Sequence, residues 1–279
     1  MRYSFFKYFF THKYYISQME KDGMYIPGKL FSPLHFVVSA IILAGIIFAI
    51  WFFTKKKDQR LLKRAYIVVW ATITIWEVVK MIWESLSGPV PYFEATGILP
   101  LYPCSVIMYT LPITIWSKNE KLKAMANGYT CTIGLIGGAI NFAYPGTALP
   151  NYSALSFVGI HAFLYHGAIL FCAITLLTTG EHSYRFAKKW TDLFLATIPI
   201  LVFSIPANIA NYTIKDHVRG DVTLVADYMF FRCDSVFLPA VFPNTPNWVT
   251  TILFYIGYIV IPALFYLPSY IAKKKKGLI

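Results

Sequence analysis

Six polar residues that are unusual inside apolar segments gather toward one end of the predicted helices: Cys104, His161, His166, Glu84, Asn208 and Asn211. An ionisable or nucleophilic side chain in a bilayer is costly unless it faces protein or a water-filled cavity, so such residues are usually functional. A thiol becomes a nucleophile when a base lies beside it, and histidine is the usual base. The set therefore predicts a shared pocket for covalent chemistry at the Cys104 sulfur.

These residues must be positioned by membrane helices, because the chain is too apolar for a soluble domain. Of its 279 residues, 57% are hydrophobic, 18% are aromatic and only 14% are charged. A helix of about 20 apolar residues spans a hydrocarbon core of roughly 30 Å. Seven such runs predict an all-α polytopic bundle, with spans near 34–53, 65–86, 98–116, 124–144, 156–178, 191–211 and 248–267.

The distribution of basic residues predicts how the bundle is oriented in the cell membrane. Basic clusters at 55–64, 118–123, 185–189 and 273–276 follow alternate spans, whereas the loops 87–97 and 145–155 contain no Lys or Arg. Lys and Arg are enriched in cytoplasmic loops. The N-terminus is therefore expected outside and the C-terminus inside. Five basic residues before the first span oppose this orientation, and the four later clusters outweigh them: Arg2, Lys7, Lys13, Lys21 and Lys29.

This topology also accounts for the net charge of +12, which in a soluble protein would suggest a nucleic-acid partner. We expect no such partner. The predicted organisation is an interfacial aromatic and basic segment (1–33), a membrane domain (34–268) and a basic cytoplasmic tail (269–279). The membrane domain includes a long outer loop, 212–247, whose apolar middle favours either a lid or a plain surface cap.

Depth in the membrane relates the thiol to the two histidines. At roughly 1.5 Å per residue, Cys104 lies about 9 Å from the outer end of its span, and His161 and His166 lie about 8 and 15 Å from theirs. We therefore predict one imidazole within about 5 Å of the thiol, the reach of a general base. The two histidines lie about 140° apart on their helix, so one can be the base while the other packs. A buried core cysteine and interhelical hydrogen bonds are the alternatives.

Two further polar sets are open to a structural or a functional interpretation. Glu77, Lys80 and Glu84 lie on one helix face, as an internal ion pair would, but Glu84 could also orient a histidine or bind a lipid amine. Asn208 and Asn211 could hold neighbouring helices together or bind a carbonyl or phosphate.

Four short motifs carry a resemblance to a known family: LPLYPC at 99–104, HAFLYHG at 161–167, DYMFFR at 227–232 and FYLP at 265–268. With them the chain resembles the YwaF-like bacterial integral membrane family and, through it, the eukaryotic transmembrane protein 164 group. The resemblance implies a lipid acyltransferase with Cys104 as the nucleophile. His166, which precedes a glycine, matches the partner histidine best, and His161 is the competing alignment. Tyr102 and Pro103 stand where the family often has His and Leu.

The sequence thus predicts an enzyme that moves an acyl chain from a phospholipid to a lysophospholipid. The predicted substrate-binding residues are Glu84, Asn208, Asn211, Tyr102 and Arg232. No cofactor and no metal are expected, since the chain has no CxxC or HxxxH pair. The alternative is a small-solute transporter or substrate-binding membrane component with a polar intramembrane site, although no repeat symmetry supports transport.

Overall fold

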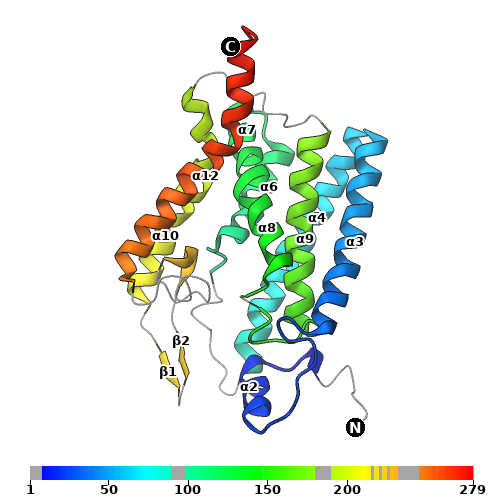
Figure 1. Cartoon of the computed structure of the whole chain (residues 1–279), viewed down its shortest axis with the longest axis vertical. Helices are drawn as coiled ribbons and strands as arrows, with labels where there is room; N and C mark the ends of the chain where they lie inside the picture. The colour runs from blue at the N-terminus through cyan, green and yellow to red at the C-terminus, as the bar shows by residue number, and fades with distance from the viewer. Residues whose placement is uncertain are drawn as a thin grey trace.

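The computed structural model describes residues 8–88, 99–146, 148–179, 190–214, 217–219, 222–224, 227–231 and 245–278. The predicted all-α bundle is confirmed (Figure 1). Its helical elements are α2 (Lys13–Lys21), α3 (Pro33–Lys56), α4 (Gln59–Ser87), η1 (Pro103–Val106), α6 (Ile107–Trp116), α7 (Glu120–Tyr129), η2 (Thr130–Gly134), α8 (Leu135–Ala143), α9 (Phe157–Thr178), η3 (Trp190–Thr197), α10 (Ile198–Thr213), η4 (Tyr228–Phe230) and α12 (Asn247–Lys275). One small antiparallel ladder joins β1 (His217–Arg219) to β2 (Val222–Leu224).

Helical segments occupy the positions of the seven apolar runs. Among the described residues, five helices are long and apolar enough to cross a membrane: α3, α4, α9, the end of η3 with α10, and α12. The third run forms a shorter apolar helix, Pro103–Trp116. The fourth is divided into α7, the π-helical turn η2 and α8. The number of crossings and the orientation of the ends stay predictions.

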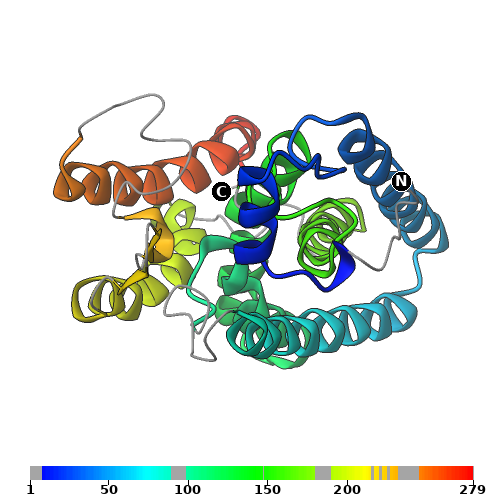
Figure 2. The same ribbon diagram turned by 90° about the horizontal axis from the view of Figure 1, so that it is seen from below.

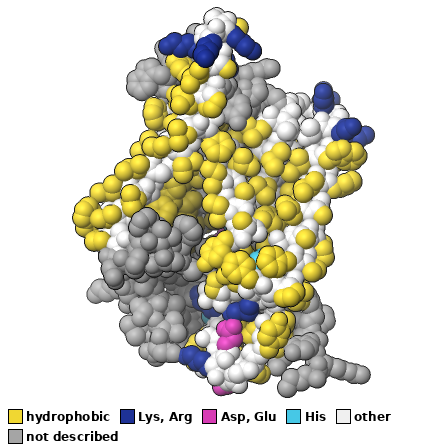
Figure 3. Space-filling view, viewed as in Figure 1, with side chains coloured by type: hydrophobic (Ala, Val, Ile, Leu, Met, Phe, Trp, Pro, Cys, Tyr) yellow, Lys and Arg dark blue, Asp and Glu magenta, His cyan; other side chains and the backbone are white. Residues whose placement is uncertain are grey.

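The surface of the bundle matches a membrane setting. Hydrophobic side chains cover the visible flanks of the helices, and Lys and Arg cluster where α12 ends (Figure 3). On α4 the outward residues Ile75, Ile82 and Leu86 are 49–65% exposed. Apolar side chains without protein contacts are stable in lipid and unfavourable in water. The exposed flanks are therefore the surface that acyl chains would cover.

Local signals between α3 and α4 force these two helices to run antiparallel. Lys57 ends α3 in the left-handed conformation, with φ of 51°. The Asp58 carboxylate then accepts hydrogen bonds from the backbone N–H groups of Arg60 and Leu61, which caps α4. Only two residues separate the helices, so α4 turns back in the direction opposite to α3, and both helices pack against α9.

Helix α9 is the centre of the larger half of the bundle. In its most apolar window 67% of residues are buried, against 11% in α3 and 17% in α4. The end-on view shows α9 between α3, α4 and the N-terminal segment (Figure 2). Helix α8 approaches closely because Gly138 has no side chain: a Cβ there would lie 3.1 Å from the His166 carbonyl oxygen. Side chains on α9 therefore meet protein on most sides.

The N-terminal segment packs across one end of this half. Ile16 on α2 and Ile26 join Tyr152 and Val158 in one hydrophobic cluster. The Lys29 ammonium forms an ion pair with Glu20. At the other end of the chain, α12 continues through the start of the predicted tail as far as Lys275. Whether the segment 1–33 lies in a membrane interface stays a prediction.

Candidate functional site

The inner face of α4 carries the charged residues. Glu77 is buried and Lys80 is partly buried, and the Lys80 ammonium lies 2.8 Å from the Glu77 Oε1 atom. Their spacing of three residues places them on neighbouring turns of one face. An ion pair of this kind inside a bundle must face protein, whereas the outward residues Ile75, Ile82 and Leu86 of α4 are apolar.

Three cross-helix contacts fix the register between α4 and α9. The Tyr66 and Thr175 hydroxyls are 2.9 Å apart, Glu77 meets His161, and the Tyr152 hydroxyl donates to the Glu84 carboxylate at 2.9 Å. Residues later in α4 contact residues earlier in the chain, first on α9 and then in the turn that precedes α9. This antiparallel register places the charged stripe of α4 against the first part of α9.

His161 is held by the charged pair on α4. Its Nε2 atom lies 3.1 Å from the Glu77 Oε2 atom, and its side chain is 5% exposed. The contact has ion-pair distance without the alignment of an ideal hydrogen bond. The Trp76 and Tyr165 rings lie 5.5 and 5.3 Å from the imidazole, centroid to centroid. Glu77 therefore contacts both Lys80 and His161, one with each carboxylate oxygen.

His166 has a different environment on the same helix. Its Nδ1 atom lies 2.7 Å from the Ala162 carbonyl oxygen, one turn earlier on α9. That contact occupies one ring nitrogen with the helix backbone. The prediction that the two histidines need not share a partner is consistent with these contacts, and of the two, His161 is the one in contact with a carboxylate.

Cys104 lies at the start of a helix, as the proline-flanked sequence suggested. It is the second residue of η1 and has a free, partly exposed thiol. The thiol interacts electrostatically with both Glu77 and Lys80, and the Ser105 hydroxyl is its hydrogen-bonding neighbour. The first turn of a helix presents backbone N–H groups that favour negative charge. The sulfur and His161 are thus linked through the same ion pair.

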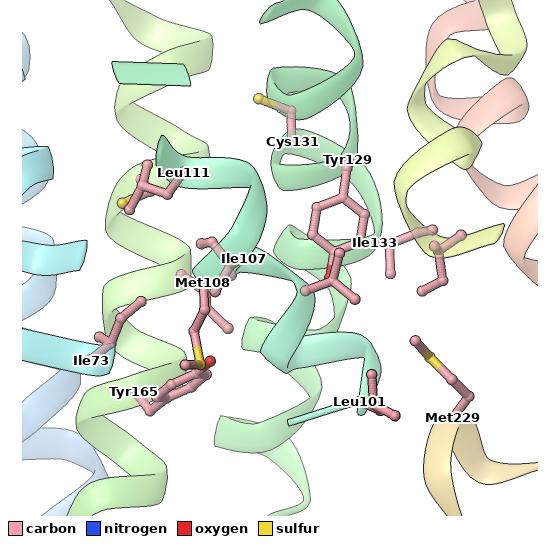
Figure 4. Packing of buried hydrophobic residues seen from close by; sticks show 14 of the residues in the cluster. Ile73, Leu101, Ile107, Met108, Leu111, Tyr129, Cys131, Ile133, Tyr165 and Met229 are labelled. Carbon is pink, nitrogen blue, oxygen red and sulfur yellow. The ribbon is translucent and has the colours of Figure 1, made fainter. Parts of the chain in front are cut away.

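The packing layer above these residues explains why they converge. Ile73, Met108 and Tyr165 approach one another from α4, α6 and α9 (Figure 4). Glu77, Cys104 and His161 each lie four residues away on the same helical runs, about one turn from this layer. Because α4 runs opposite to α6 and α9 (Figure 1), all three displacements point toward the same end of the bundle.

The sequence matches the TMEM164 family over residues 30–267. The chain belongs to the TMEM164 family. The matched region begins before α3 and ends within α12, so it contains the whole α4, η1 and α9 arrangement. No curated protein matches the chain, and no solved structure matches it. The resemblance to the transmembrane protein 164 group is confirmed, and its YwaF-like bacterial part stays a prediction.

In this TMEM164-family chain the asparagines of α10 have partners within the protein. The Asn211 side chain accepts from the Tyr228 N–H at 2.7 Å and donates to the Tyr228 carbonyl at 2.9 Å. The Asn208 amide donates to the Tyr255 hydroxyl at 2.7 Å, and that hydroxyl donates to Ser204. These contacts favour the structural interpretation of both asparagines, and their role in substrate binding stays a prediction.

The other predicted substrate-binding residues are Glu84, Tyr102 and Arg232. Glu84 holds the Tyr152 hydroxyl and interacts electrostatically with Lys80. Tyr102 packs its ring 5.5 Å from those of Tyr228 and Phe230. Arg232 lies outside the described residues. Glu84 is therefore the substrate-binding candidate that also belongs to the charged stripe.

Sequence reasoning missed one residue that supports the cysteine. The Tyr129 hydroxyl donates to the Pro103 carbonyl, directly before Cys104. Tyr129 precedes the π-helical turn η2, and such turns often occur at functional sites because they shift the facing side chains. The segment reads as a continuous apolar run, so neither the turn nor the tyrosine had a recognisable signal.

Proposed function

We propose that the protein is a membrane-embedded acyltransferase that uses Cys104 as its nucleophile and His161 as its base. The imidazole takes the thiol proton, the sulfur attacks the ester carbon of a phospholipid, and a thioester forms as the carbon–oxygen bond breaks. The proton then passes to the leaving oxygen, which releases a lysolipid. A second lysolipid hydroxyl reverses these steps and receives the acyl chain.

The observation that carries this proposal is the shared ion pair. Cys104 interacts with Glu77 and Lys80, and His161 contacts the same Glu77 at 3.1 Å. In covalent acyl transfer the base lies within reach of the nucleophile and a third group orients the base, and Glu77 has the position of that third group for His161. Membership of the TMEM164 family and the apolar surface fit a lipid substrate. The sequence favoured His166 as the base, whereas these contacts favour His161.

The test measures acylation of the sulfur directly. The purified protein in lipid nanodiscs is treated with an acyl-mimicking electrophile, and labelling of each variant is followed by intact mass. Cys104→Ala should lose labelling and transfer of a radiolabelled acyl chain from phospholipid to lysolipid. His161→Ala should slow labelling by about 10²–10⁴-fold, the usual contribution of a general base. Raising the pH should partly restore the rate by supplying thiolate.

His166→Ala is the matched control, because it removes an imidazole from the same helix. It should label within a few-fold of the wild type. Lipid turnover that survives in Cys104→Ala would exclude the covalent mechanism. A slow, pH-rescued His166→Ala beside a normal His161→Ala would assign the base to His166 instead.

A further inference from the structure

We propose that Glu77 is a positioning residue that fixes the His161 tautomer, and that Lys80 keeps Glu77 ionised for this task. The inference rests on the proposed function and deepens it, since it adds a third and a fourth residue to the site. The Glu77 carboxylate lies at ion-pair distance from Nε2 and favours the proton on that nitrogen, which leaves the lone pair of Nδ1 to take the thiol proton.

The first argument is which nitrogen Glu77 contacts. Its Oε2 atom lies 3.1 Å from Nε2 of His161. A neutral imidazole carries a proton on one nitrogen and a lone pair on the other, and the hydrogen bond of one nitrogen determines the role of the other. An ionised carboxylate can only accept, so it selects the proton on Nε2. The base atom of His161 is then Nδ1.

The second argument is the position of Lys80. A lone carboxylate buried among membrane helices would be neutralised by a proton rather than remain charged. The Lys80 ammonium lies 2.8 Å from Glu77 Oε1, on the oxygen that does not contact His161. Glu77 therefore keeps its charge and has one oxygen free for the imidazole. Lys80 acts through Glu77 and needs no contact with the substrate.

The third argument concerns the transferred proton. When Nδ1 takes the thiol proton, His161 becomes a cation between the Trp76 and Tyr165 rings. Glu77 offsets this charge, and the cation forms as the sulfur becomes negative, so the net charge of the site is unchanged. Other titratable groups interact electrostatically with this centre: Glu84 from α4, Cys104 from η1, Tyr109 from α6, and His166 and Tyr165 from α9. Any measured pH profile belongs to this coupled set.

The experiment removes the pair without leaving an unpaired buried charge. The variant is Glu77→Gln/Lys80→Met, which keeps the side-chain volumes close to the original. We expect Cys104 labelling to slow by about 10²–10⁴-fold, up to the loss of rate seen when the carboxylate of a catalytic triad is removed. The labelling rate of this double variant should rise with pH, as the labelling rate of His161→Ala does. Glu77→Asp in the Lys80 background should recover at least part of the lost rate, because it restores an ionised acceptor.

The matched control is Thr54→Val, which breaks the hydrogen bond between the Thr54 hydroxyl of α3 and the Thr178 hydroxyl of α9. It should label like the wild type with an unchanged pH profile. A double variant that folds and labels like Thr54→Val would overturn the inference, while a slow His161→Ala in the same experiment would leave the proposed function standing. Normal labelling in His161→Ala would instead reject the proposed base.

If the double variant does not fold, a measurement on the wild-type protein tests which nitrogen of His161 carries the proton. Nitrogen-15 histidine spectra of the protein in bilayers, with His161→Asn subtracted, report which ring nitrogen carries the proton. The inference requires protonated Nε2 and unprotonated Nδ1 at neutral pH. Protonated Nδ1 would overturn it.

Discussion

The α4–α9 side and the α10–α12 side of the molecule both contain polar contacts between helices, but the contacts differ in kind. On the first side, Glu77 contacts Lys80 and the His161 imidazole, and both members of the ion pair interact electrostatically with Cys104. On the second side, Asn208 and Asn211 bond to a tyrosine hydroxyl and to a backbone segment. Neutral amide contacts hold elements together and move no proton. Coupled ionisable groups can do both, which is why we place the proposed chemistry on the first side.

The largest expected difference between the two sides is in stability after removal of one partner. Lys80→Met leaves the Glu77 carboxylate buried without its counter-charge, which should cost about 3–5 kcal/mol. Glu77→Gln/Lys80→Met removes both charges and should lie within about 1 kcal/mol of the wild type. Unfolding in mixed detergent micelles measures both values. A single variant as stable as the double would mean that the pair is not coupled, and the contrast between the sides would fail.

A smaller effect is expected where Asn211 of α10 bonds to the segment that follows the helix. Asn211→Leu leaves the N–H and carbonyl of buried Tyr228 without their partner, which should cost about 2–4 kcal/mol. Thr213→Val, also on α10, removes an exposed hydroxyl and is the control, expected within about 0.5 kcal/mol. Because Asn211 has a structural role here, Cys104 labelling in the folded variant should match the wild type. A lower rate of Cys104 labelling in the folded Asn211→Leu protein would assign Asn211 to the substrate site.

The smallest effect is local and depends on pH. Burial, with Lys13 nearby, lowers the pKa of His12 from 6.5 to about 4, while Glu84 acts in the opposite direction. Its neutral Nδ1 accepts from the Tyr14 N–H and so caps α2. An undocked His12 would take a proton more readily than the docked one. Docking of α2 should therefore be fully stable above pH 6.5 and weaken as the pH falls toward 4.

Hydrogen exchange of residues 13–21 between pH 4 and 7, corrected for intrinsic rates, measures this loss. The control is His12→Phe, which cannot titrate and should show a flat profile at lower overall protection. An equal pH dependence in His12→Phe would assign the effect to another group. Cys104 labelling at a fixed pH should not differ between the two proteins.

The helices were predictable from the sequence because each depends on a local run of apolar residues. The same local signals could not reveal that η2 interrupts the fourth run, since Thr130 to Gly134 contain no proline and lie inside one predicted span. Depth along each helix predicted that Cys104 and the histidines lie toward one end, and the predicted distance of about 5 Å between the thiol and one imidazole stays a prediction. It could not choose between His161 and His166, because the choice depends on which face of α9 meets Glu77, and rotation of one helix against another is set by packing.

The roles of the asparagines were equally hidden. Asn211 bonds to Tyr228, 17 positions away, across a turn that no periodic pattern specifies. Glu77 and Lys80 were recognisable as a pair from their spacing alone. Their contact with His161 was not, since it needs the register that Tyr66 with Thr175 and Glu84 with Tyr152 impose on α4 and α9.

The spacing of Glu77 and Lys80 also bears on how the chain is assembled. Helix α4 is synthesised long before α9, so Glu77 enters the bilayer while His161 has not yet been made. With Lys80 one turn further on the same helix, the carboxylate already has its counter-charge at that moment. The helix can therefore enter the membrane with the charges of Glu77 and Lys80 offset by one another. When α9 is inserted later, the second carboxylate oxygen of Glu77 is not in contact with Lys80. His161 can therefore contact it as soon as α9 docks against α4.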